Sequence, residues 1–298
     1  VIPAAYAFAF ALQRCCIRGA GLFRALGLLP LLAPSLMPGL SLIYLFGNQG
    51  LLRHWLGGET IYGFWGIVLG EAFYTFPHAL MILSTGLALA DARLYDAARA
   101  MGANSLRRFL TVTLPASRYA VFSAACLVFT LTVTDFGVPK VVGGSYNVLA
   151  MEAYKAVVGQ LQFSKGAAIG VLLLIPAVLT FFLDRHLRAR ARGQAQGSLS
   201  AYSPLPHRQR DRYFTAVLVL VSLAILTIVG MAVWASLIKF WPYNLSLSLK
   251  SYDFNNMDGG GWLAWRNSLT MALFTAILGS ALIFLGAWVL EKLPARGQ

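Results

Sequence analysis

Charged side chains are scarce in this sequence of 298 residues. Asp, Glu, Lys and Arg together make up 12 % of it, about half the share of an ordinary soluble domain, whereas 58 % is hydrophobic. The mean hydropathy is +0.67 and the apolar residues come in long runs. This composition excludes a disordered chain, a secreted disulfide scaffold and a soluble enzyme, and it predicts a membrane protein.

Cysteine pairs and catalytic motifs are also missing. The three cysteines, Cys15, Cys16 and Cys126, show no C-x-x-C spacing, so neither a zinc site nor a disulfide framework is predicted. There is no G-x-x-x-x-G-K-[ST] phosphate loop, no H-E-x-x-H and no G-x-S-x-G, and the four histidines are scattered. We therefore expect no catalytic residue, no cofactor and no metal in this chain, which we expect not to be an enzyme.

Seven apolar segments are long enough, or nearly so, to cross a bilayer, which needs about 20 residues per helix. They predict an all-α membrane protein, a polytopic bundle of about seven transmembrane helices. Prolines inside several segments predict kinked helices that pack on one another. The segments cover residues 1–12, 25–46, 61–88, 119–138, 166–183, 213–238 and 267–290.

The net charge of +13 follows the same segmentation. Seventeen of the 24 Lys and Arg fall in the alternate stretches 13–24, 91–118, 184–213 and 291–298, whereas the acids divide evenly. This excess is the positive-inside pattern, which predicts that these four stretches are cytoplasmic. The positive charge is thus an orientation signal, and we expect membrane lipid but no nucleic acid as a partner.

A short similarity between the two ends of the sequence indicates an internal repeat. The pattern LQR followed by RG at 12–19 recurs as LEK followed by RG at 290–297, each time after an apolar span. Residues 184–212 are polar, basic and proline-bearing, as in a cytoplasmic linker. We predict most of a first half in 1–183, a linker in 184–212 and the start of a second half in 213–298, within an internal fragment of a longer protein.

The cytoplasmic stretch 91–118 has an unusual pattern. Its composition predicts a helix up to Met101, a turn at Gly102, a second amphipathic helix from Ser105 to Thr113, and a boundary at Pro115. Asp96 is expected near a helix start, where the helix dipole favours an acid. The stretch is thus predicted to be a surface helical hairpin that docks on a partner.

The spacing of this hairpin resembles a known motif. Asp96, Ala97 and Ala98 are followed at fixed intervals by Gly102, Val112 and then Leu114 and Pro115. This resembles the E-A-A-x3-G-x9-I-x-L-P loop of the permeases of ATP-binding-cassette (ABC) importers, with Asp for Glu and Val for Ile. The motif's residues here are Asp96, Ala97, Ala98, Arg99, Gly102, Val112, Leu114 and Pro115.

The resemblance extends over essentially the whole chain and implies a function. The loop would hold the coupling helices that sit in a cleft of a dimer of ATP-binding subunits, so ATP would be bound and hydrolysed on those separate chains. A substrate-binding protein outside the cell membrane would deliver the substrate. The expected location is the bacterial inner membrane, with several spans. An alternative for the hairpin is a surface element packed on lipid headgroups.

The substrate is less well defined. The runs TDFGVP at 134–139, YDF at 252–254 and DGGGW at 258–262 resemble 2-aminoethylphosphonate permeases. The arrangement of two halves in one chain is similar to that of both phosphonate and ferric iron permeases. The resemblance implies 2-aminoethylphosphonate or a related phosphonate as substrate, with ferric iron as the alternative.

Two acids near the predicted spans are candidates for the transport pathway. Glu71 lies inside the third span, six residues before Pro77, and Asp135 lies near the outer end of the fourth. A carboxylate inside a membrane is costly and is a functional candidate. Either acid can instead have a structural role, Glu71 by accepting a bond at the kink and Asp135 at a helix end. An ion-coupled secondary transporter, with such acids as coupling sites, is the alternative from another class.

Overall fold

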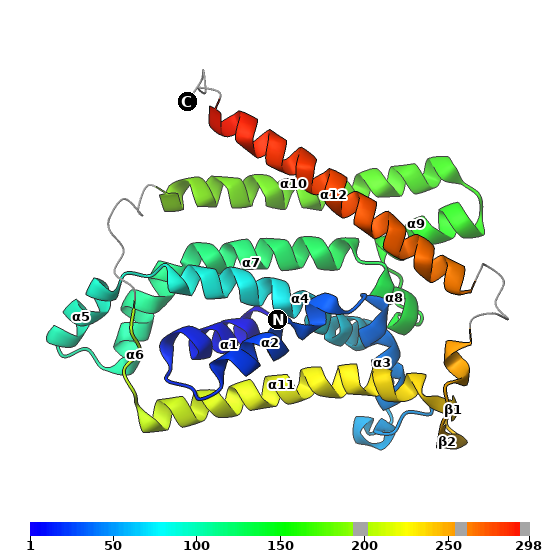
Figure 1. The fold of residues 1–298 in the computed structure, drawn as a ribbon, viewed down its shortest axis with the longest axis horizontal. Helices are drawn as coiled ribbons and strands as arrows, with labels where there is room; N and C mark the ends of the chain where they lie inside the picture. Colours follow the sequence, from blue (N-terminus) through cyan, green and yellow to red (C-terminus); the bar gives the residue numbers. More distant parts are fainter. Residues whose placement is uncertain (193–201, 254–260, 293–298) are drawn as a thin grey trace. The chain divides into compact units, whose positions relative to one another are not determined.

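The structure, a computed structural model, describes residues 1–192, 202–253 and 261–292, and divides into two compact units, 1–235 and 236–298 (Figure 1). The helices and strands are α1 (Ile2–Arg14), α2 (Ala20–Leu28), α3 (Leu36–Phe46), α4 (Phe64–Ala88), α5 (Ala92–Ala100), α6 (Ser105–Arg108), α7 (Leu114–Thr134), α8 (Gly137–Val142), α9 (Leu149–Tyr154), α10 (Phe163–Arg192), α11 (Arg208–Ser236), β1 (Ile238–Phe240), β2 (Asn244–Leu247) and α12 (Trp262–Lys292).

Five helices of the described residues are long and apolar enough to cross a membrane, and a bent pair makes a sixth. This confirms a polytopic helical membrane protein, with fewer full-length spans than the seven predicted. The difference lies partly in α1, which has 13 residues and is therefore about 20 Å long, short of a bilayer core of about 30 Å. The five helices are Phe64–Ala88, Ser105–Thr134, Phe163–Leu187, Arg208–Ser236 and Trp262–Leu290.

The predicted span 25–46 is not one continuous helix, because the chain turns sharply inside it. Two helical pieces, Ala20–Leu32 and Leu36–Phe46, meet at an angle of 101°. Ala33 is extended at the break, with φ −91° and ψ 133°. The residue before a proline is driven out of the helical region by the proline ring, and Ala33 precedes Pro34. The prolines that were expected to kink one helix therefore separate two.

The core of the first unit is built around α4. Phe8 of α1 lies edge to face against Phe76 of α4, with ring centroids 5.6 Å apart, and both are buried. Leu218 and Ile225 of α11 belong to the same buried cluster. Helix α11 also accepts a bond from α3, because the Ser41 hydroxyl donates to the Ile228 carbonyl at 2.8 Å. Helix α11, with which the predicted second half begins, thus packs on helices of the predicted first half. The division of the chain into two halves stays a prediction.

The predicted linker 184–212 is partly helical. Helix α10 continues nine residues beyond the predicted end of its span, and α11 begins at Arg208. Residues 193–201 of the linker lie outside the described residues. So do residues 254–260, which hold part of the DGGGW run, and residues 293–298, which hold part of the second copy of the repeat.

The second unit contains a small β-hairpin that an all-α prediction did not include. Strands β1 and β2 pair antiparallel, with Ile238 opposite Leu247 and Phe240 opposite Asn244. The Ser236 hydroxyl and the Tyr252 hydroxyl share a hydrogen bond of 2.8 Å beside it. With so few residues, this hairpin is a local feature of a loop between two long helices.

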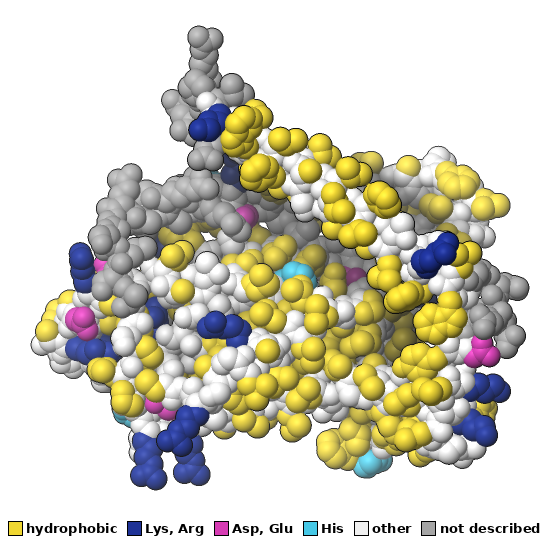
Figure 2. Space-filling model, viewed as in Figure 1, with side chains coloured by type: hydrophobic (Ala, Val, Ile, Leu, Met, Phe, Trp, Pro, Cys, Tyr) yellow, Lys and Arg dark blue, Asp and Glu magenta, His cyan; other side chains and the backbone are white. Residues whose placement is uncertain are grey.

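Charge placement in the first unit agrees with the predicted orientation. In Figure 1 the α5–α6 hairpin, the C-terminal part of α10 and the start of α11 lie at one end of this unit, and α8 and α9 lie at the other. Hydrophobic side chains are spread over much of the face visible in Figure 2, and most of the lysines and arginines seen there lie toward its edges. The described residues of the stretches predicted to be cytoplasmic, 91–118, 184–192 and 202–213, therefore come together at one end.

Candidate functional site

The predicted helical hairpin is present at residues 91–113, and we call it the docking hairpin after its predicted role. Helix α5 ends at Ala100, Gly102 turns the chain with φ +72°, and α6 starts at Ser105. A positive φ strains residues that carry a Cβ, so glycine suits this turn. The Asn104 side chain caps α6 by accepting a bond from the Arg107 N–H at 2.8 Å. The local signals that predicted a helix, a turn and a second helix are confirmed.

The acid at the start of α5 is not the one that was predicted. Asp91 is the N-cap, and its carboxylate accepts a bond from the Arg93 N–H at 3.0 Å. Asp96 is the fifth residue of the helix, is 70 % exposed, and pairs with Arg99 at 3.2 Å. An exposed pair of this kind adds little stability. Asp96 is therefore free to meet a partner protein rather than required to cap its own helix.

Pro115 does not separate two helices, contrary to the prediction. The segment runs as one helical rod from Ser105 to Thr134, with a π-helical turn at Phe109–Thr113 just before the proline. In this turn the Leu114 N–H donates to the carbonyl of Phe109, five residues earlier. Pro115 lies at the start of α7, where its missing N–H costs little. The docking hairpin is thus joined rigidly to a membrane span.

The hairpin presents apolar side chains that the described residues leave exposed. Leu94 and Met101 are 54 % and 78 % exposed, and Leu106 and Leu110 are 67 % and 52 % exposed. An exposed group of large apolar side chains beside charged ones is typical of a protein interaction site. We call these four residues the hairpin face.

Each predicted motif residue has a definite place on the hairpin. Ala98 is buried at 4 % exposure, where its small side chain allows α5 to pack closely. Arg99 is partly buried and donates to the Tyr202 hydroxyl at 3.4 Å. The exposed motif residues are Asp96, Ala97, Gly102, Leu114 and Pro115, and Val112 is half-buried. The motif is thus split between packing residues and residues available to a partner.

Residues outside the motif anchor the hairpin, and the sequence reasoning missed them. The buried Tyr95 hydroxyl donates to the Thr113 hydroxyl at 3.1 Å, which joins α5 to the π-helical turn. Arg14 at the end of α1 lies over the rings of Tyr95 and Tyr202, at 4.9 and 4.3 Å from their centroids. Its guanidinium also donates to the Leu87 carbonyl at 2.5 Å. In the sequence, the position of Tyr95 directly before the motif was the one signal that could have pointed to these anchoring residues.

The structure brings Glu71 and Asp135 together, although 64 residues separate them. Glu71 is 3 % exposed, and Asp135 and Thr132 lie beside it. No described residue donates a hydrogen bond to either Glu71 carboxylate oxygen, so a structural bond at the Pro77 kink finds no partner. Asp135 does act at a helix start, where its carboxylate accepts a bond from the Val138 N–H at 2.9 Å. Glu71 is the stronger pathway candidate.

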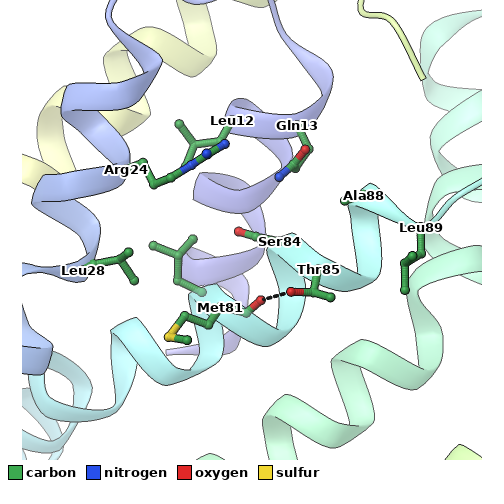
Figure 3. Close-up of a pocket in the computed structure, with 10 residues that line it drawn as sticks. Leu12, Gln13, Arg24, Leu28, Met81, Ser84, Thr85, Ala88 and Leu89 are labelled. Atoms are coloured by element: carbon green, nitrogen blue, oxygen red, sulfur yellow. Dashed lines mark hydrogen bonds between the residues drawn. The ribbon is translucent and has the colours of Figure 1, made fainter. Parts of the chain in front are cut away.

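A separate cavity of about 340 Å³ lies between α1, α2 and α4. Figure 3 shows Gln13 of α1 and Arg24 of α2 across from Ser84 and Thr85 of α4. The Thr85 hydroxyl donates to the Met81 carbonyl of its own helix. The other polar side chains that line the cavity, Gln13, Arg24 and Ser84, can donate hydrogen bonds into it. Its polar residues come from three segments, which explains why no sequence motif marks it. Arg24 is the one charged residue among the described residues that line the cavity, so its positive charge suits an anionic or neutral polar ligand.

A comparison with models of protein families identifies the family of this chain. Residues 17–193 match the model of the family described as binding-protein-dependent transport system inner membrane component. The chain belongs to this family. The matched residues contain the docking hairpin, Glu71 and Asp135, so both candidate sites lie in the part that defines this inner-membrane permease family.

The sequence identities to individual relatives are low. Ferric transport system permease protein FbpB 1 of Haemophilus influenzae is 25 % identical over 317 residues, covering 100 % of this chain and 50 % of the relative. FbpB of Actinobacillus pleuropneumoniae is 24 % identical, covering 100 % and 46 %. Molybdenum transport system permease protein ModB of Escherichia coli is 33 % identical over 142 residues, covering 46 % and 61 %. The chain spans about half the length of the ferric relatives.

Proposed function

We propose that this chain is part of the permease of an ABC importer, in which it lines the substrate pathway and receives movement from ATP-binding subunits. The observation that carries the proposal is the docking hairpin, whose exposed hairpin face is joined to the span Ser105–Thr134 without a break. Family membership supports it, because the family consists of inner membrane components that depend on a binding protein.

The hairpin geometry supports a mechanical role. A partner that moves the hairpin face also moves α7, because the π-helical turn continues into that helix. Helix α7 packs along α4, which carries Glu71. Closure of the ATP-binding subunits would thus reach the candidate pathway through two packed helices, without chemistry in this chain.

Site-specific photocrosslinking tests the proposal. Benzoylphenylalanine at Met101 of the full-length protein, produced with its ATP-binding subunits, is expected to form a covalent adduct with such a subunit. The control position is Trp55, which is 71 % exposed on the 3-10 turn Arg53–Leu56 and is predicted to lie outside the cytoplasm. Absence of any adduct from Leu94, Met101 and Leu106 would refute the docking role. Uptake that persists with a hydrolysis-inactive ATP-binding subunit would favour an ion-coupled transporter instead.

For the substrate, we favour ferric iron over 2-aminoethylphosphonate. The relatives that cover the whole chain carry ferric transport in their names, whereas the prediction of a phosphonate finds no support among the relatives reported above. The neighbouring acids, buried Glu71 and partly buried Asp135, add a physical reason. Two neighbouring carboxyl groups attract a hard cation and oppose the passage of a phosphonate anion.

A further inference from the structure

Three arginines line a small cavity under the docking hairpin. Arg14 from α1, Arg108 from α6 and Arg210 from α11 surround a space of about 50 Å³, together with Tyr95 and Tyr202. Aspartate and glutamate are missing from the described residues that line it. Most of a permease core avoids buried charge, so three cations around one cavity require a physical explanation. We call this site the arginine pocket.

Arg14 is the most deeply buried of the three, at 3 % exposure. Its contacts are the Leu87 carbonyl and the faces of two tyrosine rings. These are neutral groups, so they do not cancel its charge. Its Nε–H is buried and finds no acceptor among the described residues. An arginine in this position has a donor and a positive charge that both remain available to an anion.

Arg108 has the same kind of unused donor. Its Nε–H is buried without an acceptor in the described part of the chain, and one terminal nitrogen donates to the Ser105 hydroxyl at 3.2 Å. Arg210 differs, because Asp211 neutralises it at 2.8 Å. The pocket therefore has two uncompensated guanidinium groups, from Arg14 and Arg108, each with an Nε–H that lacks an acceptor.

We propose that the arginine pocket binds a phosphate group, supplied by the headgroup of an anionic phospholipid or by free inorganic phosphate. Planar guanidinium groups match phosphate oxygens in shape and charge, and desolvation strengthens such charge-assisted bonds. A space of about 50 Å³ suits one tetrahedral anion and excludes a nucleotide. The pocket lies at the end of the first unit that is predicted to be cytoplasmic, where basic pockets between helices bind lipid headgroups.

A bound phosphate would tie three segments together. The pocket is lined by the end of α1, by the docking hairpin and by Tyr202 of the linker. Tyr202 already contacts the hairpin through Tyr95, with ring centroids 4.6 Å apart. Occupancy is therefore expected to hold α5 in place.

Direct binding measurements on the full-length permease, purified with its ATP-binding subunits in detergent and stripped of lipid, test the proposal. One arm measures 32P-labelled orthophosphate by equilibrium dialysis. The other counts phosphatidylglycerol or phosphatidylcholine that stays bound in native mass spectrometry. The variant is Arg108→Gln, and the matched control is Arg107→Gln, which removes the same charge from an exposed neighbour that does not line the pocket.

We expect saturable binding that Arg108→Gln weakens at least about tenfold and Arg107→Gln leaves unchanged, since a bond to a charged group is lost only in the former. Binding of phosphatidylglycerol without orthophosphate assigns the lipid as the source, and the reverse assigns free phosphate. Equal weakening by both substitutions, or equal retention of phosphatidylcholine, would show general surface attraction and overturn the pocket. Absence of saturable binding in both arms overturns it as well. Arg14→Gln is a second variant with the same expectation.

Discussion

Glu71 is a carboxyl group in a buried position, although carboxyl groups favour water or a hydrogen-bond donor. A carboxyl group inside a membrane protein is retained at a cost, and this one is 3 % exposed with no hydrogen-bond donor among the described residues. Its neighbour Asp135 is held at the start of α8 by the Val138 N–H. One acid is thus fixed by the backbone, and the other has no hydrogen-bond donor among the described residues.

Replacing the Glu71 carboxyl group is therefore expected to impair transport. In the full-length importer, Glu71→Gln should lower uptake of 55Fe(III), supplied with the binding protein, at least about tenfold, because a carboxyl group that can give up its proton to bind the cation is replaced by an amide of the same size that cannot. Glu59→Gln, at an exposed loop position, is the control and should leave uptake unchanged. Full ferric uptake by Glu71→Gln would contradict a pathway role. Competition by 2-aminoethylphosphonate, with ferric uptake absent, would restore the phosphonate prediction.

At the scale of elements, α7, which continues from the docking hairpin, packs on α4, which carries Glu71. The two helices approach closely at Gly86, where an added Cβ would overlap with the Ala120 side chain of α7. Small residues allow such close packing between membrane helices. The helices are therefore expected to move as one body, because no large side chain separates them at this point.

Gly86→Val is expected to disrupt this contact. Overpacking should lower the free energy of unfolding by about 1–3 kcal/mol. The control is Gly170→Val in α10, where an added Cβ meets nothing within 4 Å and the change in helix propensity is the same. Thermal unfolding of the full-length protein in detergent measures both. Equal midpoints for the two variants would show that α4 and α7 do not pack as closely as described.

For the whole molecule, orientation follows from the arrangement of charge along the chain. The docking hairpin, the described residues of the linker and the start of α11 lie at one end of the first unit (Figure 1). Most arginines of residues 1–235 belong to these segments. The positive-inside rule assigns this end to the cytoplasm. The native cysteines report on it, because Cys16 is exposed whereas Cys15 is buried.

Labelling with a membrane-impermeant maleimide is expected to follow this orientation. In a Cys126→Ser background, Cys16 should react in inverted vesicles but not in intact spheroplasts, and an introduced Trp55→Cys should show the opposite pattern. Cys15 should stay unlabelled near pH 7, because burial raises the pKa of its thiol to about 11 and the reactive thiolate forms only as the pH rises toward that value. Labelling of Cys16 in intact spheroplasts would reverse the predicted topology.

The sequence by itself determined the features that depend on composition and on short-range order. Apolar run length identified the long spans, and the loop charges agree with the end at which the hairpin lies. The pattern around Gly102 predicted the docking hairpin, because a turn of positive φ and a capping residue are properties of a few consecutive residues. The resemblance to permeases rested on the same local spacing, and family membership confirms it.

The tertiary structure decided what depends on residues distant in the chain. Whether a proline bends a helix or ends it depends on the bonding around it, which is why the span at 25–46 breaks at Pro34 while Pro115 lies inside a continuous rod. Only folding brings Glu71 beside Asp135, or Arg14 beside Arg108 and Tyr202. These neighbours matter because the free-energy cost of burying a charged side chain depends on whether the groups around it neutralise the charge.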